Sequence, residues 1–466
     1  MNTSAYVKIL RERLSNSIAL PFRDILTINT MQQALNELNI KYRKRLYDPI
    51  ITLWTFVWQV LDPDKSCSNA VSHILSFLAD NDDNCHDNDV KPVKLPSNDT
   101  GAYCKARKRL DLRFIIHLFR HTGQNLHSKL SDTFLWCNRS VFLVDGSSLS
   151  TYDSVENKKE FTQPKNQHKY HGFPVARIVG IFCLATGAVI EAIIDSFDTS
   201  EIKLFRMLYS HLKAGDIALG DRLFGSYADI SLLYQGGVDS VFRMNALRKP
   251  DFTKGKSLGH YDHLVYWKKP KQGTIHLEQE LYNKLPDTML LREIRFFINI
   301  KGYRTKVVTL VTTLLDHKVY TMELLAQLYG FRWQVEIDLR HLKTTMKMEH
   351  IPSKTPDMVR KEFYVHLLAY NLIRTTLLES GIKHGVHPLR LSFKGAIQHT
   401  LNFVPILAMI NKDYRHFIYA TMLTIISHCK LLERPFRVEP RMVRKRTKVF
   451  SHLKRPRQEV RQKLVA

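Results

Sequence analysis

The sequence has few of the features that mark secreted or membrane proteins. Its 466 residues include six cysteines, scattered and without a C-x-x-C pair, so we expect neither a disulfide framework nor a zinc finger. The most apolar stretch, residues 178–194, is broken by Thr186-Gly187 and contains Glu191, so it does not predict a membrane-spanning helix. The first residues contain no signal-peptide core. We therefore expect a globular protein that stays in the cytoplasm and has no membrane partner.

The sequence is also poor in acidic residues. It holds 44 Asp and Glu against 69 Lys and Arg, which gives a formal net charge of +25. Such an excess predicts a polyanionic partner, because Lys and Arg gain affinity for nucleic acid by releasing the counterions condensed on its phosphates. An anionic membrane surface is the weaker alternative. The length allows about two to four domains with a large core.

Helical periodicity dominates residues 1–135. The run from Ile50 to Leu61 is apolar nearly all round, which predicts a buried helix. Two stretches of the region are strongly basic, Lys41 to Arg45 and Lys105 to Arg113. Each is either a basic solvent face or a DNA-binding surface, and the net charge favours DNA contact. The candidate DNA-binding residues of the second stretch are Lys105, Arg107, Lys108 and Arg109.

From Ser140 onward, short apolar strands alternate with helical segments. Residues 140–145 predict a buried strand that ends in Asp145, and residues 216–221 predict another that ends in Asp221. Residues 176–194 read as a hairpin. This order predicts an α/β protein with a mixed sheet flanked by helices, a type of fold in which sites form at strand ends.

The segment from Tyr329 to Lys343 reads as one amphipathic α-helix. At about 100° per residue, one charged stripe contains Tyr329, Arg332, Glu336 and Lys343, with Arg340 at its edge. A separate apolar sector contains Phe331, Val335, Leu339, Leu342 and Met346. The charged stripe is either a solvated face, on which Glu336 pairs with Arg332 or Arg340, or a metal-binding carboxylate beside phosphate-binding cations.

Three carboxylates favour the second interpretation. An isolated aspartate at a strand end is more often a turn or cap residue, but Asp145, Asp221 and Glu336 together form an all-oxygen set of ligands. Such a set suits Mg²⁺ or Mn²⁺, and a pair of these ions would serve a phosphodiester reaction. Arg332 and Lys343 would then hold the phosphates beside the scissile bond.

The pattern Y-x2-R-x3-E-x6-K, matched by Tyr329, Arg332, Glu336 and Lys343, resembles the signature of DDE transposases of bacterial insertion sequences. The resemblance is to the IS-four type, a group that includes the Tn-five and Tn-ten enzymes. Residues 144–147 (Val-Asp-Gly-Ser) resemble the region of the first aspartate, and residues 220–225 (Gly-Asp-Arg-Leu-Phe-Gly) that of the second. The likeness extends over residues 50–410.

The resemblance implies an RNase H-like (ribonuclease H-like) mixed-sheet core interrupted by a β insertion. It implies Asp145, Asp221 and Glu336 as catalytic metal ligands, with two Mg²⁺ or Mn²⁺ ions as cofactors. It implies that a homodimer binds double-stranded DNA. This DNA comprises the transposon ends with their inverted repeats and the target DNA. The residues then expected on DNA are Tyr329, Arg332, Lys343, Arg222 and, by analogy with an insertion-domain tryptophan, Trp267, for which a core or surface position is the more ordinary interpretation.

The expected division of the chain has six parts. They are a helical N-terminal DNA-binding region (1–135), the first part of the core (136–244), an inserted β subdomain (245–305), the second part of the core with the catalytic helix (306–380), a helical C-terminal region (381–430) and a basic tail (431–466). The expected function is cut-and-paste transposition in a bacterial cytoplasm, at the nucleoid. The alternatives are a transposase-derived DNA-binding protein that no longer moves DNA and, less favoured, a structure-selective nuclease.

Overall fold

The computed structural model resolves two compact units. Unit 1 joins residues 1–129 to residues 340–431, and unit 2 contains residues 130–339 with 432–466. The residues that the structure describes are 7–8, 10–11, 14, 17–79, 96–130, 134–163, 172–272, 277–298, 307–432, 455, 459–460 and 462–463. Most of the predicted basic tail lies outside them. The six-part division of the chain stays a prediction.

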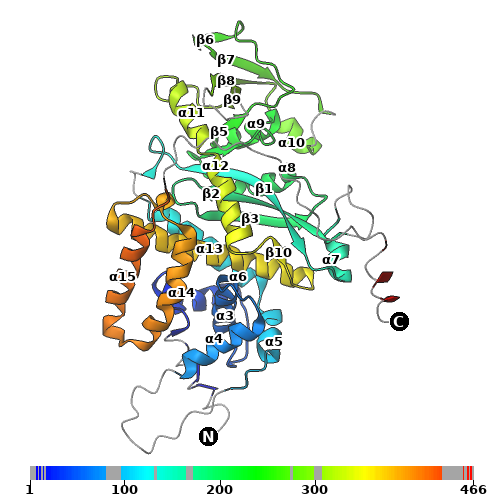
Figure 1. Ribbon diagram of the computed structural model, residues 1–466. Coiled ribbons are helices and arrows are strands. Elements are labelled where there is room, and N and C mark those ends of the chain that lie inside the picture. The colour runs from blue at the N-terminus through cyan, green and yellow to red at the C-terminus, as the bar shows by residue number, and fades with distance from the viewer. Residues whose placement is uncertain are drawn as a thin grey trace, which may run out of the picture. The chain divides into compact units, whose positions relative to one another are not determined.

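A large mixed β-sheet forms the centre of unit 2 (Figure 1). Its strands are β1 (Val141–Thr151), β2 (Val175–Cys183), β3 (Val189–Ser196), β4 (Ile217–Gly220), β5 (Asp239–Arg243), β6 (Lys256–Gly259), β7 (Asp262–Lys268), β8 (Thr288–Phe297) and β9 (Val307–Thr312). The strand order is β3-β2-β1-β4-β5-β9-β8-β7-β6. Strands β3, β2 and β1 pair antiparallel, whereas β1, β4 and β5 pair parallel. This β3-β2-β1-β4-β5 arrangement confirms the predicted RNase H-like core.

The two short strands predicted to be buried lie at the centre of this core. Val141 to Val144 and all of β4 are buried, as expected for strands covered on both faces. The core around them includes Phe142, Val179, Leu204, Phe205, Phe224 and Phe242. The helices of unit 2 are α7 (Val155–Glu160), α8 (Glu201–Arg206), η3 (Tyr209–His211), α9 (Tyr227–Gln235), α10 (Gln279–Lys284), α11 (Met322–Gly330) and α12 (Trp333–Arg340, whose last residue belongs to unit 1).

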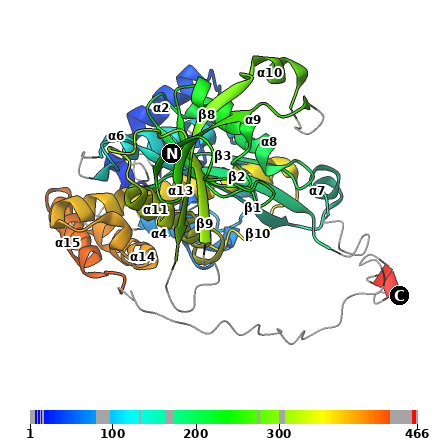
Figure 2. The same ribbon diagram turned by 90° about the horizontal axis from the view of Figure 1, so that it is seen from above.

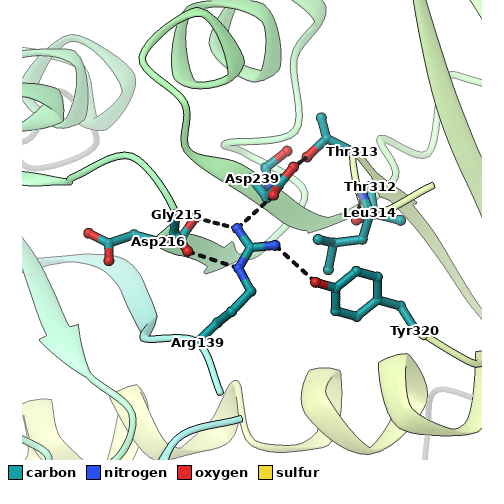
Figure 3. A network of polar contacts seen from close by, with 9 residues as sticks. Arg139, Gly215, Asp216, Asp239, Thr312, Thr313, Leu314 and Tyr320 are labelled. Atoms are coloured by element: carbon teal, nitrogen blue, oxygen red, sulfur yellow. Dashed lines mark hydrogen bonds and ion pairs between the residues drawn. The ribbon is translucent and has the colours of Figure 1, made fainter. Parts of the chain in front are cut away.

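Arg139 links the starts of the parallel strands (Figure 3). Its guanidinium donates to the Gly215 carbonyl before β4 at 2.8 Å and to Asp239 Oδ2 at the start of β5 at 2.6 Å. It also donates to the Tyr320 hydroxyl at 3.2 Å. Asp239 in turn accepts a hydrogen bond from Thr313 Oγ1, just after β9. The network fixes the amino ends of β4 and β5, so that their carboxyl ends are held in register for a site.

The predicted β insertion extends the same sheet. Strand β9 pairs antiparallel with both β5 and β8, and β7 and β6 follow beyond β8. A buried ion pair joins Arg292 of β8 to Asp262 of β7, with Nε–Oδ1 at 2.8 Å and Nη2–Oδ2 at 2.5 Å. Its two parallel bonds fix the register of these two strands.

Unit 1 is helical and is built around one long helix, α13 (Pro356–His384), which is yellow-orange in Figure 1. Helix α13 packs against α3, α6, α14 and α15. Thr355 caps its start, Pro356 occupies the first turn, and Gly385 ends it in a left-handed conformation. The other elements are η1 (Phe22–Asp24), α2 (Ile28–Glu37), α3 (Pro49–Leu61), α4 (Cys67–Ala79), α5 (Gly101–Arg109), α6 (Leu112–Ser128), η5 (His341–Thr345), β10 (His350–Ile351), η6 (Pro388–Arg390), α14 (Phe393–Met409), η7 (Lys412–Tyr414) and α15 (Arg415–His428).

Helices α3 and α14 of unit 1 are both held by buried apolar side chains. The run from Ile50 to Leu61 forms α3, and every residue from Ile51 to Leu61 is buried, as predicted. Helix α14 continues through Pro405 and ends at Met409 (Figure 2 shows α14 beside α15). Buried Val404 and Leu407 on either side hold the helix against its neighbours, which offsets the backbone hydrogen bond that proline cannot make. No helix among the described residues has the length and apolar character needed to cross a membrane.

Candidate active site

Asp145 and Asp221 occupy matching positions on adjacent parallel strands. The paired part of β1 and β4 ends at Leu143 opposite Leu219, and each aspartate stands two residues further along the chain. Both aspartates therefore lie just beyond the β1–β4 pairing, and the charge of Asp221 acts on the Asp145 carboxyl group. Asp221 directly follows β4, as predicted, whereas β1 continues well past Asp145 in its antiparallel pairing with β2. The prediction that Asp145 ends its strand is therefore wrong.

One carboxylate oxygen of each aspartate accepts a hydrogen bond from a nearby backbone amide. Asp145 Oδ1 accepts a hydrogen bond from the Gly146 amide at 2.9 Å, and Asp221 Oδ1 accepts one from the Leu223 amide at 2.7 Å. Within the described part of the chain, the second oxygen of each has no hydrogen-bond partner. The turn role expected for an isolated strand-end aspartate is thus present at Asp221, and it still leaves one carboxylate oxygen for a cation.

The segment predicted as one α-helix has three parts. Tyr329 lies in the last turn of α11, α12 begins at Trp333, and a π-helical turn follows at His341–Thr345. Between α11 and α12 the bonds are of the tighter i→i−3 type, from the amide of Arg332 to Tyr329 O and from Gln334 to Phe331 O. A uniform 100° per residue therefore does not apply, and the prediction of one continuous α-helix is wrong. The Arg332 guanidinium nevertheless lies beside both the Tyr329 ring and the Glu336 carboxylate. Phe331, assigned to the apolar sector, is 54 % exposed because this junction turns it outward.

Arg332 and Glu336 form an ion pair at the start of α12. Arg332 Nη2 lies 2.9 Å from Glu336 Oε1. This is the i,i+4 ion pair that was expected if the charged stripe were a solvated face. The Arg332 side chain is 13 % exposed and that of Glu336 is 41 % exposed. Arg332 Nε is buried and has no hydrogen-bond partner among the described residues. The arginine therefore retains a donor for a further acceptor, such as a phosphate oxygen.

The electrostatic environment joins these groups into one site. Burial raises the pKa of Asp145 to about 7, and the negative charges of Asp221 and Glu336 add to this effect, while the Gly146 amide and Arg332 oppose it. Burial also raises the pKa of Tyr329, against the opposing charges of Arg332 and Arg243. Asp221 and Glu336 are thus each close enough to Asp145 for their charges to act on its carboxyl group.

The ligand chemistry fits a divalent ion. Carboxylates that repel one another, each with an oxygen to spare, are the ligands that Mg²⁺ and Mn²⁺ prefer. In the described residues, however, no three carboxylate, histidine or cysteine side chains are gathered closely enough to hold a metal ion already. Because Glu336 is the most exposed of the three and is held by Arg332, it is the side chain that must turn to complete such a site.

Glu201 is a fourth carboxylate at this site, and the sequence pattern gave no sign of it. It begins α8, and burial raises its pKa with a further contribution from Asp221, opposed by Arg177. Gly146, next to Asp145, lies directly against it: a Cβ at position 146 would meet the Glu201 carboxyl carbon and one oxygen at 2.4 Å. Only glycine allows this approach of β1 to the Glu201 side chain.

A basic cavity of about 390 Å³ lies beside the site in unit 2. The cationic residues that line it are Arg222, Arg243, Arg248, Lys249 and Arg295, and no acidic residue lines it. Arg222 follows Asp221 directly, and the positive charge of Arg243 lowers the pKa of Tyr329, against the effect of burial. Of these five, only Arg222 was predicted from the sequence, because folding is needed to bring Arg222, the stretch from Arg243 to Lys249, and Arg295 together.

Trp267 lies in β7 and is 3 % exposed. Its Nε1 donates to Glu293 Oε1 at 2.6 Å, and the Arg248 guanidinium lies 3.6 Å from the ring centroid. The ring is thus covered on one face by an arginine of the basic cavity. A role for this tryptophan on DNA stays a prediction.

The remaining predicted residues lie in unit 1. Lys343 is in the π-helical turn, beyond the boundary between the units. On α5, Lys105, Lys108 and Arg109 are exposed, whereas Arg107 turns inward. Its Nη1 donates to Gln59 Oε1 at 2.9 Å, and its guanidinium lies 4.2 Å from the Phe56 ring centroid. The structure leaves the DNA-binding role of all four α5 residues as a prediction.

Residues 136–372, which include all three carboxylates, match the family described as Transposase DDE domain. This region is more than half of the chain. The chain belongs to this family of DDE transposases. The protein is therefore an enzyme that cuts and joins DNA, it binds DNA, and membership of the family implies dependence on a divalent metal.

Named relatives agree with this assignment. The chain is 26 % identical over 361 residues to the transposase InsG of insertion sequence element IS4 from Escherichia coli K12, covering 76 % of this chain and 75 % of InsG. It is 27 % identical over 140 residues to the putative transposase InsZ of the same organism, covering 29 % of this chain and 46 % of InsZ. Among solved structures, it is similar to the piggyBac transposase in a synaptic complex with hairpin DNA, at 12 % identity and a TM-score of 0.42, covering 90 % of this chain and 86 % of that one.

Proposed function

We propose that this transposase moves an insertion sequence by cut-and-paste, cutting phosphodiester bonds at the terminal inverted repeats and joining the freed ends to target DNA. The observation that carries the proposal is the matching position of Asp145 and Asp221 on adjacent parallel strands, with Glu336 close enough to raise the pKa of Asp145. The similarity to the IS4 transposase supports an insertion sequence as the substrate.

Asp145, Asp221 and Glu336 are the proposed metal ligands. When bound, a pair of Mg²⁺ or Mn²⁺ ions would activate the attacking water or 3′-hydroxyl and stabilise the leaving oxygen. The protein's own part is to present the oxygens from strand β1, from the turn directly after β4 and from helix α12. Before the metal binds, Arg332 supplies the counter-charge that Glu336 needs, and the raised pKa keeps much of Asp145 neutral near pH 7.

Arg332, Tyr329 and Lys343 are proposed to contact phosphates of the transposon end. The unpaired Nε of Arg332 supports this role, because the arginine keeps a donor for phosphate while its Nη2 pairs with Glu336. The basic cavity provides a second phosphate-binding surface beside Asp221, lined by five cations without a carboxylate. We assign Arg222, Arg243 and Lys249 to it as DNA contacts.

In unit 1, we propose that the exposed cations of α5, Lys105, Lys108 and Arg109, help to recognise the transposon end. A homodimer that joins two ends is part of the proposal, since strand transfer of both ends requires two active sites. If deletion of residues 1–130 left specific end binding intact, the assignment of end recognition to this region would be wrong.

The test uses the full-length chain with DNA that carries the sequences flanking its own gene, in the presence of Mg²⁺. We expect nicking at the ends, abolished in Glu336→Gln although the variant still binds end DNA. Glu323→Gln is the matched control, because Glu323 is an exposed carboxylate on α11. Specific end binding without any cleavage by the wild type would favour the idle DNA-binding protein instead. Cutting of branched DNA without need of an end would favour a structure-selective nuclease.

A further inference from the structure

Unit 1 contains a cavity of about 690 Å³ between the segment that joins α2 to α3 and the junction of α5 with α6. Its volume is in the range of about 300 to 1,000 Å³ that is typical of small-molecule sites. The apolar floor consists of side chains that are at most 3 % exposed, namely Leu35, Leu110 and Phe114. Tyr42 and Tyr47 add two further rings to the wall.

Four cations line the same cavity and lack a compensating acid. Lys41, Arg43, Arg45 and Arg109 are all exposed, and within the described residues none of them makes an ion pair. They come from two stretches far apart in the sequence, which only the fold brings together. Four unpaired positive charges around one cavity favour an anionic ligand.

The two carboxylates of the lining are already engaged. Asp48 Oδ2 accepts from Arg11 Nη2 at 2.5 Å, and its Oδ1 caps α3 through the Ile51 amide at 2.9 Å. Asp111 Oδ2 accepts from Arg113 Nη2 at 2.7 Å, and its Oδ1 caps α6 through the Arg113 amide. Neither acid is therefore available to neutralise the four cations, and the cavity keeps its positive charge.

The aromatic side chains are held in place by neighbours. The Tyr42 hydroxyl donates to Gln32 Oε1 at 3.2 Å, and the Tyr47 ring lies 5.6 Å from that of Tyr103. Phe114 is fully buried in α6. The half-buried Tyr42 and Tyr47 rings are thus preorganised, so a planar group entering the cavity would stack on them without the loss of much side-chain freedom.

We propose that this cavity binds one unpaired nucleotide of the DNA strand, with the base on the apolar floor and the flanking phosphates on Lys41, Arg43, Arg45 and Arg109. An aromatic platform beside a cationic rim is the combination that single-stranded nucleic acid requires. Contact with duplex phosphates alone would use the cations but would leave the apolar floor empty. A protein partner would have to supply several acids at one point. The inference deepens the proposed end recognition by unit 1.

The first test is a crosslinking experiment with the full-length protein and a short oligothymidylate that contains a single iodouracil. We expect a photo-adduct on Tyr42 or Tyr47, identified by mass spectrometry of the digested protein. An excess of unmodified oligothymidylate should abolish it, and an excess of free thymidine monophosphate should not. Adducts confined to residues outside the cavity would overturn the proposal, and so would competition by the free nucleotide at equal concentration.

The second test compares affinities for the same oligothymidylate and for an abasic strand of equal length. Because base stacking contributes about 1 to 3 kcal/mol per base, we expect wild type to bind the oligothymidylate about tenfold more tightly or better. The double variant Arg43→Ala/Arg45→Ala should lose about tenfold in affinity for the oligothymidylate. The matched double variant Lys383→Ala/Lys412→Ala removes the same charge from exposed residues of unit 1 outside the lining and should lose much less.

Equal binding of the two strands by wild type, or equal losses in the two double variants, would overturn the inference. These outcomes are separate from failure of the proposed function, which is read from Mg²⁺-dependent cleavage of end DNA. If wild type cleaves end DNA but binds the oligothymidylate no more tightly than the abasic strand, only the proposed nucleotide site is contradicted. If wild type binds the oligothymidylate more tightly than the abasic strand but does not cleave end DNA, only the catalytic proposal is contradicted.

Discussion

Arg332 Nη2 lies 2.9 Å from Glu336 Oε1, so the cation that we assign to phosphate binding is already paired with a proposed metal ligand. In the free enzyme, the positive charge of Arg332 therefore neutralises the negative charge of Glu336. If Glu336 held a metal ion, Arg332 would lose this partner and could turn both its Nη2 and its unpaired Nε to DNA. Metal binding and phosphate binding should therefore strengthen one another, as linked equilibria must.

The coupling of Arg332 to DNA can be measured through salt dependence. We expect Arg332→Ala to weaken binding of end DNA by about tenfold and to reduce the slope of log affinity against log salt concentration by about one, because one phosphate contact is lost. Mg²⁺ should improve DNA affinity in wild type and have a smaller effect in the variant. The control is Arg120→Ala, which removes a charge from α6 outside both cavities. An unchanged slope would show that Arg332 does not contact phosphate.

Gly146 and Glu201 should be coupled in stability. Gly146→Ala places a Cβ at 2.4 Å from the Glu201 carboxylate, so the side chain must move, and we expect a loss of about 1 to 3 kcal/mol in the free energy of unfolding. Glu201→Ala in the same chain should recover most of the loss. A thermal-denaturation double-mutant cycle measures the coupling. Gly330→Ala, whose Cβ meets nothing within 4 Å, is the control and should not destabilise. Additive effects at positions 146 and 201 would contradict the contact.

The Arg139 network should matter for stability and not for chemistry. Arg139→Met leaves Asp239 without its guanidinium partner, and we expect a loss of about 2 to 3 kcal/mol, discounted because both side chains are about one-fifth exposed. The variant should unfold at lower temperature. Below that temperature it should cleave DNA at close to the wild-type rate, since the network lies at the end of the strands away from Asp221. A large loss of cleavage in the folded variant would contradict this separation.

Acid should destabilise unit 1 through His341. Burial and the positive charges of Arg374 and Arg340 lower the pKa of this histidine from 6.5 to about 3. Between about pH 6.5 and 3, His341 is therefore protonated in the unfolded chain but not in the folded chain. The contribution of His341 to the free energy of unfolding falls as pH decreases through this window and is constant above it. His341→Gln should reduce the slope of unfolding free energy against pH between about 5 and 6.5. His416→Gln, at an exposed position, should leave it unchanged.

The order of elements in the core was accessible from the sequence because its signals are local. Continuous apolar runs identified β1 and β4, and the Thr186-Gly187 turn identified the β2–β3 hairpin. Glu336 and the two aspartates were found from spacing and resemblance. The helix that carries Glu336 was misjudged, because the tight junction before Trp333 and the π turn after Arg340 depend on packing and not on a local pattern.

Residues gathered only by folding could not be predicted. Glu201 reaches the site because Gly146 leaves room for it, and a single glutamate at a helix start carries no distinguishing signal. The basic cavity in unit 2 combines cations from three separate segments, and the cavity in unit 1 combines two. Charge in the sequence indicated that DNA is the partner. Only the fold indicates where cations meet without acids to neutralise them.

The central claim is that Asp221 binds the catalytic metal, and a change of metal preference tests it most directly. In Asp221→Cys, a thiolate replaces one carboxylate, and thiolates bind Mn²⁺ far better than Mg²⁺. We predict that the variant, with DNA binding intact, does not cleave end DNA in Mg²⁺ and regains cleavage in Mn²⁺. Cleavage by the variant in Mg²⁺ at the wild-type rate would contradict the account.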